Sequence, residues 1–430
     1  MVDYISNKIE TIRKLFYFRV YLNILRLKAT ILYYITPETK KYDVVIIDDS
    51  VPKYHSGFRD YEFSGFLREY KNIALFSIIG SKVSKLRQYA YYHIQTTKAW
   101  KKSKAEFVKD NKINPDSIRP FHSWTKVNAK LAYCVFMTNG VYLIDYLEKR
   151  KLKFILELYP GGGFSILTEG FMYDNLKKVI GSPYLEKVIV NQAVSREFLL
   201  EQNLCDKSKI VYIHGGFVSA DFMDLPSKTV HYPRDKKTID VCWAGAKYMP
   251  KGVNKGYDIF IDMAHYLLDT APGYNFHFHV VGGFDEFEIP IDPKHRPKFT
   301  YYGFLKNKEF TEFYKDKDIF ICPLRPNLLG KGVFDGFPTG VSGEAGLHGI
   351  CLLLSDPLNQ NEVFKDGYDS FFLENDPIQY ANKVLELAKD PEQIYIVGDR
   401  SRITMQKKYD HKNQFDQRFA LINEFLEKNK

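Results

Sequence analysis

Two separate series of short apolar runs, with helical stretches between their members, constrain the fold of this chain more than any other feature. Runs of this kind that end at glycine, proline or aspartate are typical of the buried strands of a parallel sheet. The first series places expected strands at residues 43–49, 73–79, 133–138, 153–158 and 187–190. The second series places them at residues 238–245, 275–281, 299–303, 318–323 and 350–355. This alternation predicts an α/β protein with two Rossmann-like domains that face each other across a cleft.

The boundary between the two domains is expected where the composition shifts to proline, lysine, serine and aspartate, within residues 225–237. We expect an N-terminal domain at residues 41–232 and a C-terminal domain at residues 238–410. A helical segment at residues 1–40 precedes them, and a helix at residues 411–430 is expected to return to the first domain. The length of 430 residues agrees with two domains, because it exceeds what one core usually holds.

The composition is that of an ordinary globular protein with a small basic excess. The formal charge is +9, from 61 basic and 52 acidic residues. This excess suits anionic small molecules or anionic lipid surfaces, and it gives no reason to expect nucleic acid. The five scattered cysteines form no Cys-x-x-Cys pair, so neither a zinc site nor a disulfide framework is expected. We find no signal peptide and no apolar run long enough to span a bilayer, and therefore expect a cytoplasmic protein.

Residues 1–40 interleave apolar side chains such as Ile12 and Leu15 with basic ones such as Arg13 and Lys14. This pattern predicts one or two basic amphipathic helices. Such a helix docks on an anionic membrane surface or packs on the protein's own core, and both interpretations stay open.

A glycine-rich stretch at residues 334–349 carries two acids, Asp335 and Glu344, nine positions apart. It lies between two expected strands, so its loop falls at the carboxyl end of a parallel sheet, where α/β folds bind ligands. Glycines there let backbone amides approach a phosphate or a sugar closely. A helix-capping carboxylate explains either acid alone, whereas the whole constellation predicts a binding site.

An ordered set of turns in the second half resembles the nucleotide-sugar-binding domain of retaining, two-domain (GT-B) glycosyltransferases of family 4. The matching segments, in chain order, are Gly245-Ala246-Lys247, Asn254-Lys255-Gly256, Val281-Gly282-Gly283, Tyr302-Gly303-Phe304, residues 334–349 and Asn361-Glu362-Val363. The first half is similar to that family more loosely, at Ser56-Gly57-Phe58 and at residues 194–217. The resemblance covers roughly residues 41–410.

The resemblance implies an enzyme that moves a sugar from a nucleotide-sugar to a glycan or glycolipid acceptor, with retention, without metal and without a further cofactor. Lys247 and Lys255 would stabilise the diphosphate, Glu344 would hold the ribose, and Asp335 would hold hydroxyls of the transferred sugar. Asp335 and Lys255 are the catalytic candidates. The remaining implied donor contacts are Gly57, Gly245, Gly282, Gly303, Phe304, Gly336 and Phe337.

This chain departs from the family pattern at two places in the implied donor site. The family carries two glutamates separated by seven residues, whereas here the first acid is Asp335 and the spacing is one residue longer. The basic residue that usually follows the first glycine is replaced by Ala246. Two other functions therefore stay open: a nucleotide-sugar epimerase of similar fold, and a catalytically silent scaffold at a membrane surface.

The segment from Glu157 to Gly163 follows an expected strand of the first domain and should face the cleft. We expect Glu157, Gly162 and Gly163 to bind the acceptor. The glycines either shape an acceptor pocket or form a tight turn. Asp48 and Asp49 invite a metal interpretation, but they lack a third ligand in the pattern and are expected to cap the end of a strand.

Overall fold

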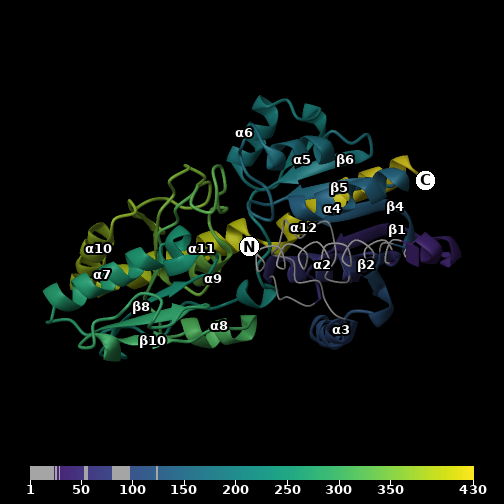
Figure 1. The fold of residues 1–430 in the computed structure, drawn as a ribbon. Helices are drawn as coiled ribbons and strands as arrows, with labels where there is room; N and C mark the ends of the chain where they lie inside the picture. The colour runs from purple at the N-terminus through teal and green to yellow at the C-terminus, as the bar shows by residue number, and fades with distance from the viewer. Residues whose placement is uncertain (1–23, 25–26, 29, 53–56, 80–96, 123) are drawn as a thin grey trace, which may run out of the picture.

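The computed structural model describes residues 24, 27–28, 30–52, 57–79, 97–122 and 124–430, and these form two parallel sheets flanked by helices (Figure 1). The first sheet has the strand order β3-β2-β1-β4-β5-β6-β7 and the second has the order β10-β9-β8-β11-β12-β13. Every pair of neighbouring strands in both sheets is parallel. The predicted α/β fold with two Rossmann-like halves is confirmed.

The first sheet and its helices occupy the chain up to Tyr212. Its strands are β1 (Glu38–Asp48), β2 (Ile73–Ile78), β3 (Ile118–Phe121), β4 (Lys126–Val135), β5 (Lys153–Leu158), β6 (Leu185–Val190) and β7 (Ile210–Tyr212). Its helices are α2 (Gly57–Glu69), α3 (Thr97–Asn111), α4 (Met137–Lys149), α5 (Phe171–Ile180) and α6 (Ala193–Glu201).

The second sheet begins at Ile239. Its strands are β8 (Ile239–Ala244), β9 (Phe276–Val281), β10 (Phe299–Tyr301), β11 (Ile319–Cys322), β12 (Cys351–Leu354) and β13 (Phe371–Phe372). The helices that follow are α7 (Tyr257–Thr270), α8 (Asn307–Tyr314), α9 (Gly340–Leu347), α10 (Pro377–Lys389), α11 (Pro391–Lys408) and α12 (His411–Lys428).

Each sheet is apolar on both faces because helices cover both faces. Along β1, Val45 and Ile47 pack with α4 and α5, whereas Val44 and Ile46 pack with α2 and α12. A strand buried on both sides reads as a continuous apolar run, which is why the central strands were predictable. The strands that prediction missed, β3, β7 and β13, are short and lie at sheet edges.

Two of the predicted strands differ from their predicted bounds by more than two residues. β4 starts at Lys126, because its first half alternates polar and apolar residues, and it ends before Thr138, which belongs to α4. β1 starts at Glu38, inside the segment that the sequence assigns to residues 1–40. Of that segment, residues 1–23, 25–26 and 29 lie outside the described residues, and residues 30–35 are helical.

The last helix, α12, packs against the first domain, where its yellow ribbon runs alongside the first sheet in Figure 1. Ile422 and Phe425 of α12 join the apolar cluster formed by α2, α3 and one face of the first sheet. The chain therefore crosses between the domains twice, once near residues 213–238 and once at the start of α12.

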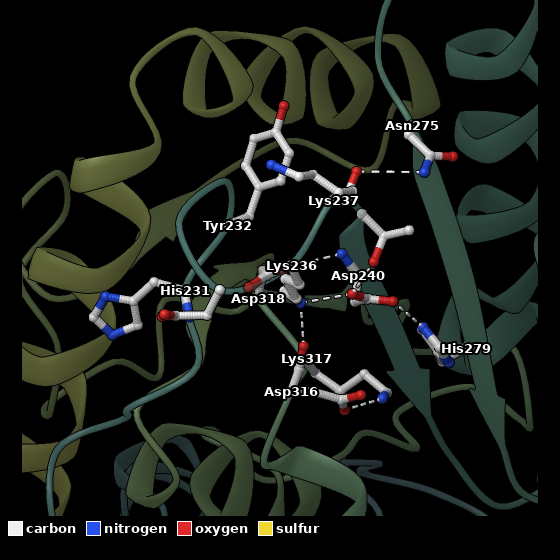
Figure 2. Close-up of polar contacts among 12 residues, drawn as sticks. His231, Tyr232, Lys236, Lys237, Asp240, Asn275, His279, Asp316, Lys317 and Asp318 are labelled. Atoms are coloured by element: carbon white, nitrogen blue, oxygen red, sulfur yellow. Dashed lines mark hydrogen bonds and ion pairs between the residues drawn. The ribbon is translucent and has the colours of Figure 1, made fainter.

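An ion-pair network fixes the first crossing to the second sheet (Figure 2). The Lys236 ammonium lies 2.6 Å from the Asp240 carboxylate and 2.6 Å from the Asp318 carboxylate. His279 Nε2 lies 2.7 Å from the other oxygen of Asp240, and the Tyr395 hydroxyl donates to Asp318 at 2.9 Å. Asp240 and Asp318 lie at the amino ends of β8 and β11, at the sheet edge opposite to the carboxyl ends. The network therefore holds the segment that joins the two domains, and it lies away from the edge where the predicted site residues lie.

Candidate functional site at the carboxyl ends of the two sheets

The carboxyl ends of the two sheets meet through loops from both domains. Gln192, which follows β6, accepts a hydrogen bond from the Phe337 amide at 3.1 Å. Gly57, at the start of α2, lies against Glu344 of α9, since a Cβ placed on Gly57 would lie 3.8 Å from Glu344 Oε1. The loop and helix that carry Asp335 and Glu344 therefore lie against the first domain.

Asp335 and Lys255 form an ion pair at this edge. Lys255 Nζ lies 2.6 Å from Asp335 Oδ1, and both side chains are mostly covered. Burial alone would lower the pKa of Lys255, but the Asp335 carboxylate outweighs it and holds that pKa above its usual value. Lys255 ends the turn before α7, and its carbonyl accepts a hydrogen bond from Trp243 Nε1 at 3.0 Å. The arrangement sets a fixed cation beside a carboxylate, which suits a phosphate next to a sugar hydroxyl.

Glu344 lies in the second turn of α9. Thr339 caps this helix by accepting a hydrogen bond from the Ser342 amide at 3.3 Å. Burial raises the pKa of the Glu344 carboxyl to about 7. A carboxyl that is this poorly hydrated gains from new hydrogen-bond donors, and the two hydroxyls of a ribose would supply them.

Three of the predicted glycines meet at the ends of β8, β9 and β10. The Gly282 amide donates to the Gly303 carbonyl at 2.8 Å, and the Gly245 amide donates to the Val281 carbonyl at 3.1 Å. Gly282 has a φ of +130°, and a Cβ there would lie 2.1 Å from the Gly245 carbonyl oxygen, so only glycine fits. Phe304, next to this turn, is 77% exposed.

Lys247 does not join the Lys255–Asp335 pair. Its ammonium pairs with Glu288, which also accepts a hydrogen bond from the Lys251 amide. Of these two lysines, Lys255 is the one that pairs with Asp335. Lys247 lies beside the glycine turn at Gly283.

Phe337, one of the donor contacts that the resemblance implies, has its amide and its ring engaged within the protein. Its N–H donates to Gln192, and its ring is buried in the second domain next to Phe372, with ring centroids 5.7 Å apart. Gly336 lies against Gln192 and Pro160 of the first domain. No feature of the sequence indicated that Gln192 would accept the hydrogen bond of this amide, although its position two residues after β6 could have marked it as a residue of the cleft edge.

Glu157 differs from its expected role in acceptor binding. Its carboxylate is fully buried, where it pairs with Arg418 of α12 and accepts a hydrogen bond from Tyr133. Burial would raise its pKa, but the Arg418 guanidinium holds it below the usual value. Glu157 lies near the end of β5 but points into the protein, because strand residues alternate between the two faces of the sheet.

Gly162 and Gly163 form a tight turn against the start of α4. Both have positive φ, and the Gly162 carbonyl accepts a hydrogen bond from the Thr138 amide at 3.0 Å. A Cβ on Gly162 would lie 2.2 Å from the Phe136 ring, and one on Gly163 would lie 2.6 Å from Thr138. The glycines are required by this packing, whichever ligand the neighbouring edge binds.

Asp48 and Asp49, at the end of β1, share the Arg59 guanidinium, which lies 3.0 Å from each. Asn139 of α4 donates to both acids. Burial and the charge of Asp48 raise the pKa of Asp49 to about 6. In the part of the chain that the structure describes, no three His, Cys, Asp or Glu side chains are grouped to hold a metal ion.

Part of the second domain matches a known family model. Residues 240–390 match the family model of glycosyl transferases group 1. A curated relative, an uncharacterized 41.2 kDa protein in the cps region of Klebsiella pneumoniae, is 20% identical over 276 residues, covering 62% of this chain and 69% of that protein.

Solved structures share the fold over most of the chain. A glycosyltransferase from Rickettsia africae ESF-5 aligns with a TM-score of 0.57 and 16% identity, covering 90% of this chain and 99% of that one. HepE from Anabaena, solved in complex with UDP, aligns with a TM-score of 0.58 and 14% identity over 88% of this chain and 99% of HepE. The lipopolysaccharide outer core galactosyltransferase WaaB aligns with a TM-score of 0.52 and 13% identity over 87% of this chain and all of WaaB, 100%.

Proposed function

We propose that this chain is a glycosyltransferase that moves a sugar from a uridine diphosphate donor to a hydroxyl of a surface glycan or glycolipid. The match of residues 240–390 to the family model of glycosyl transferases group 1 supports the activity. The uridine diphosphate part of the proposal is supported by HepE, which was solved with UDP and with UDP-glucose. The acceptor class is supported by the relative from a cps region and by the outer-core enzyme WaaB.

The observation that carries the proposal is the Lys255–Asp335 pair at the carboxyl end of the second sheet. As the sugar leaves, negative charge grows on the diphosphate, and an ammonium held at that point stabilises the transition state more than the ground state. Asp335, released from Lys255 by the incoming phosphate, accepts hydrogen bonds from hydroxyls of the sugar. Glu344 accepts those of the ribose.

The proposed reaction breaks the bond between the anomeric carbon and the β-phosphate oxygen, and forms a bond from that carbon to the acceptor oxygen. The acceptor's proton passes to the departing phosphate oxygen, and the configuration at the anomeric carbon is retained. We assign no side chain as the base and no resident metal or cofactor, so the positive charge at the leaving group comes from Lys255.

The test is a titration of UDP, UDP-glucose, UDP-galactose and UDP-N-acetylglucosamine into the wild type and Lys255→Ala, followed by thermal unfolding and calorimetry. We expect at least one UDP-sugar to bind, with affinity reduced about tenfold or more in Lys255→Ala. Lys294→Ala, which removes an exposed lysine paired with Asp269, is the matched control and should bind as the wild type does. Failure of every nucleotide to bind the wild type would refute the donor site, and conversion of a free UDP-sugar to its epimer would assign an epimerase instead.

We further propose that the helical residues 30–35 touch an anionic membrane surface. Ile31, Tyr34 and Ile35 are exposed on this segment, while Tyr33 faces the body of the protein under Lys126 and Lys149. Exposed apolar side chains beside basic ones match an interfacial helix. None of the described helices is long and apolar enough to cross a bilayer.

Vesicle flotation tests this contact. The triple variant Ile31→Ser, Tyr34→Ser and Ile35→Ser should lose binding to phosphatidylglycerol vesicles, and substitution is preferable to removing residues 1–40 because β1 begins at Glu38. Phosphatidylcholine vesicles are the control for charge. Equal flotation of wild type and variant would contradict the proposal.

A further inference from the structure

A loop of the second domain, residues 327–337, is anchored in the first domain, and we call it the bridging loop. It follows β11 and leads to α9, and it carries Asp335. Its Phe334 is only 4% exposed and belongs to the apolar core of the first domain. The Phe334 ring lies 6.1 Å from that of Phe164, which in turn packs against Phe198. A side chain of one domain thus completes the core of the other.

Two hydrogen bonds between the domains hold the backbone of the bridging loop on either side of Phe334. The Ile166 amide of the first domain donates to the Gly332 carbonyl at 2.9 Å. The Phe337 amide donates to Gln192 Oε1 at 3.1 Å, and both groups are buried. Gly332 has a φ of +72°, and a Cβ there would lie 3.0 Å from the carbonyl carbon of Ile166, so the loop approaches the first domain at backbone distance.

Three side chains near the end of the bridging loop point in different directions. Phe334 enters the first domain, Asp335 meets Lys255, and Phe337 enters the core of the second domain. The Asp335 carbonyl accepts a hydrogen bond from Gln360 at 3.0 Å, which holds the peptide that follows Asp335. The place of the Asp335 carboxylate is therefore set by contacts with both domains at once.

We propose that Phe334 and Gln192 are positioning residues through which the first domain places Asp335 against the transferred sugar. The proposal rests on the sugar-binding role proposed above for Asp335. Separation of the domains would withdraw Phe334 from its site and leave the Phe337 amide without Gln192, so Asp335 would lose its fixed place. The donor's sugar is then held firmly only when the acceptor-binding domain is in position, which limits transfer of the sugar to water.

The first test compares UDP with UDP-glucose, because the two ligands share the nucleotide and differ in the sugar. In Phe334→Ala and in Gln192→Leu, we expect the Kd for UDP to stay within about twofold and the Kd for UDP-glucose to rise about tenfold, as expected for losing one charge-assisted hydrogen-bond set. Phe334→Leu keeps an apolar side chain and should restore most of the affinity. Phe310→Ala, which removes a buried ring from α8, is the control for general destabilisation and should change neither Kd.

The second test needs no ligand. Hydrogen exchange of the Ile166 amide should be about tenfold faster in Phe334→Ala than in the wild type, because that amide is protected by a carbonyl of the other domain. Amides inside β5 should not change. Unchanged exchange at Ile166, or equal losses of UDP and UDP-glucose affinity, would overturn the proposal. A wild type that binds neither ligand would instead refute the proposed function, and the exchange result would still decide whether Phe334 holds the loop.

Discussion

Arg418 of α12 and Glu157 of β5 form an ion pair although they lie 261 positions apart in the chain, and neither side chain has any exposed surface. Glu62 of α2 lies beside them, 3.6 Å from Arg418 Nε, and its Oε1 lies 2.5 Å from the Tyr133 hydroxyl oxygen. Burial and the charge of Glu157 raise the pKa of Glu62 well above its usual value. The last helix of the chain thus supplies the only cation that the described residues place against these two acids, and it ties α12 to the first domain.

Replacing Arg418 by methionine should therefore destabilise the first domain strongly. The variant leaves the Glu157 carboxylate buried without its cation, which costs about 3 to 5 kcal/mol in comparable cases. Urea unfolding of the two proteins at pH 7 measures the loss. Lys428→Met removes an exposed ion pair from the same helix and should leave the free energy of unfolding nearly unchanged. Equal stability of Arg418→Met and Lys428→Met would contradict this account.

The ion-pair network in Figure 2 predicts which residue stabilises the second domain. Lys236→Met leaves the carboxylates of Asp240 and Asp318 without the cation between them, and should cost about 3 to 5 kcal/mol at pH 7. Burial would raise the pKa of Asp240, but hydrogen bonds from His279 and Lys236 hold it well below the usual value.

The sign of the pH effect follows from that lowered pKa. The stabilisation from Asp240 is present above the unfolded value of 3.8 and is lost as the pH falls below it. The difference in unfolding free energy between wild type and Lys236→Met should therefore shrink from pH 7 to pH 3. A constant difference across that range would contradict the assignment, and Lys294→Met serves as the exposed control.

Glu344 predicts a pH dependence of donor binding. Its pKa near 7 means that the empty site is largely protonated at pH 6 and ionised at pH 8, and the ionised form is the better acceptor for ribose hydroxyls. The affinity for UDP-glucose, whose diphosphate does not titrate in this range, should rise by up to about tenfold from pH 6 to pH 8. Calorimetry at both pH values measures it, and Glu344→Gln should abolish the dependence. The same slope in Glu344→Gln would assign it to another group.

The two lysines of the donor edge should differ in their effect on catalysis. Lys255→Ala removes the cation beside Asp335, and we expect kcat to fall roughly 100- to 1000-fold, as when one group that stabilises transition-state charge is removed. Lys247→Ala removes an ammonium that pairs with Glu288, and we expect a change of less than about tenfold in kcat. Release of UDP over time measures both variants. A larger loss in Lys247→Ala would reverse the roles of the two lysines.

The central strands could be predicted from the sequence because they are buried on both faces, as the run Val44 to Ile47 shows. Edge strands such as β7 (Ile210–Tyr212) were missed, because a short strand with one covered side has no distinct pattern. Asp335 and Glu344 were predicted to lie at one sheet edge because the carboxyl ends of parallel strands meet there, whereas Lys255 was named from the family resemblance. The structure brings Lys255 and Asp335 together.

The partners of the site residues could not be predicted, because they come from far along the chain. The sequence predicted that Glu157 faces the cleft, because no nearby residue indicates that Arg418 of the last helix pairs with it. The sequence analysis assigned Phe334 only to the glycine-rich stretch, and it is the placement of the two domains that puts its ring inside the core of the first domain. Side chains that pack across domains leave no periodic signal.

The most direct test of the donor site is a crystal structure of the protein with a bound UDP-sugar. We predict that the ribose hydroxyls lie within hydrogen-bond distance of Glu344, the diphosphate lies within reach of Lys255, and the sugar lies against Asp335. A nucleotide bound elsewhere, for example at the amino-end network of Lys236, with Glu344 and Lys255 untouched, would contradict the account.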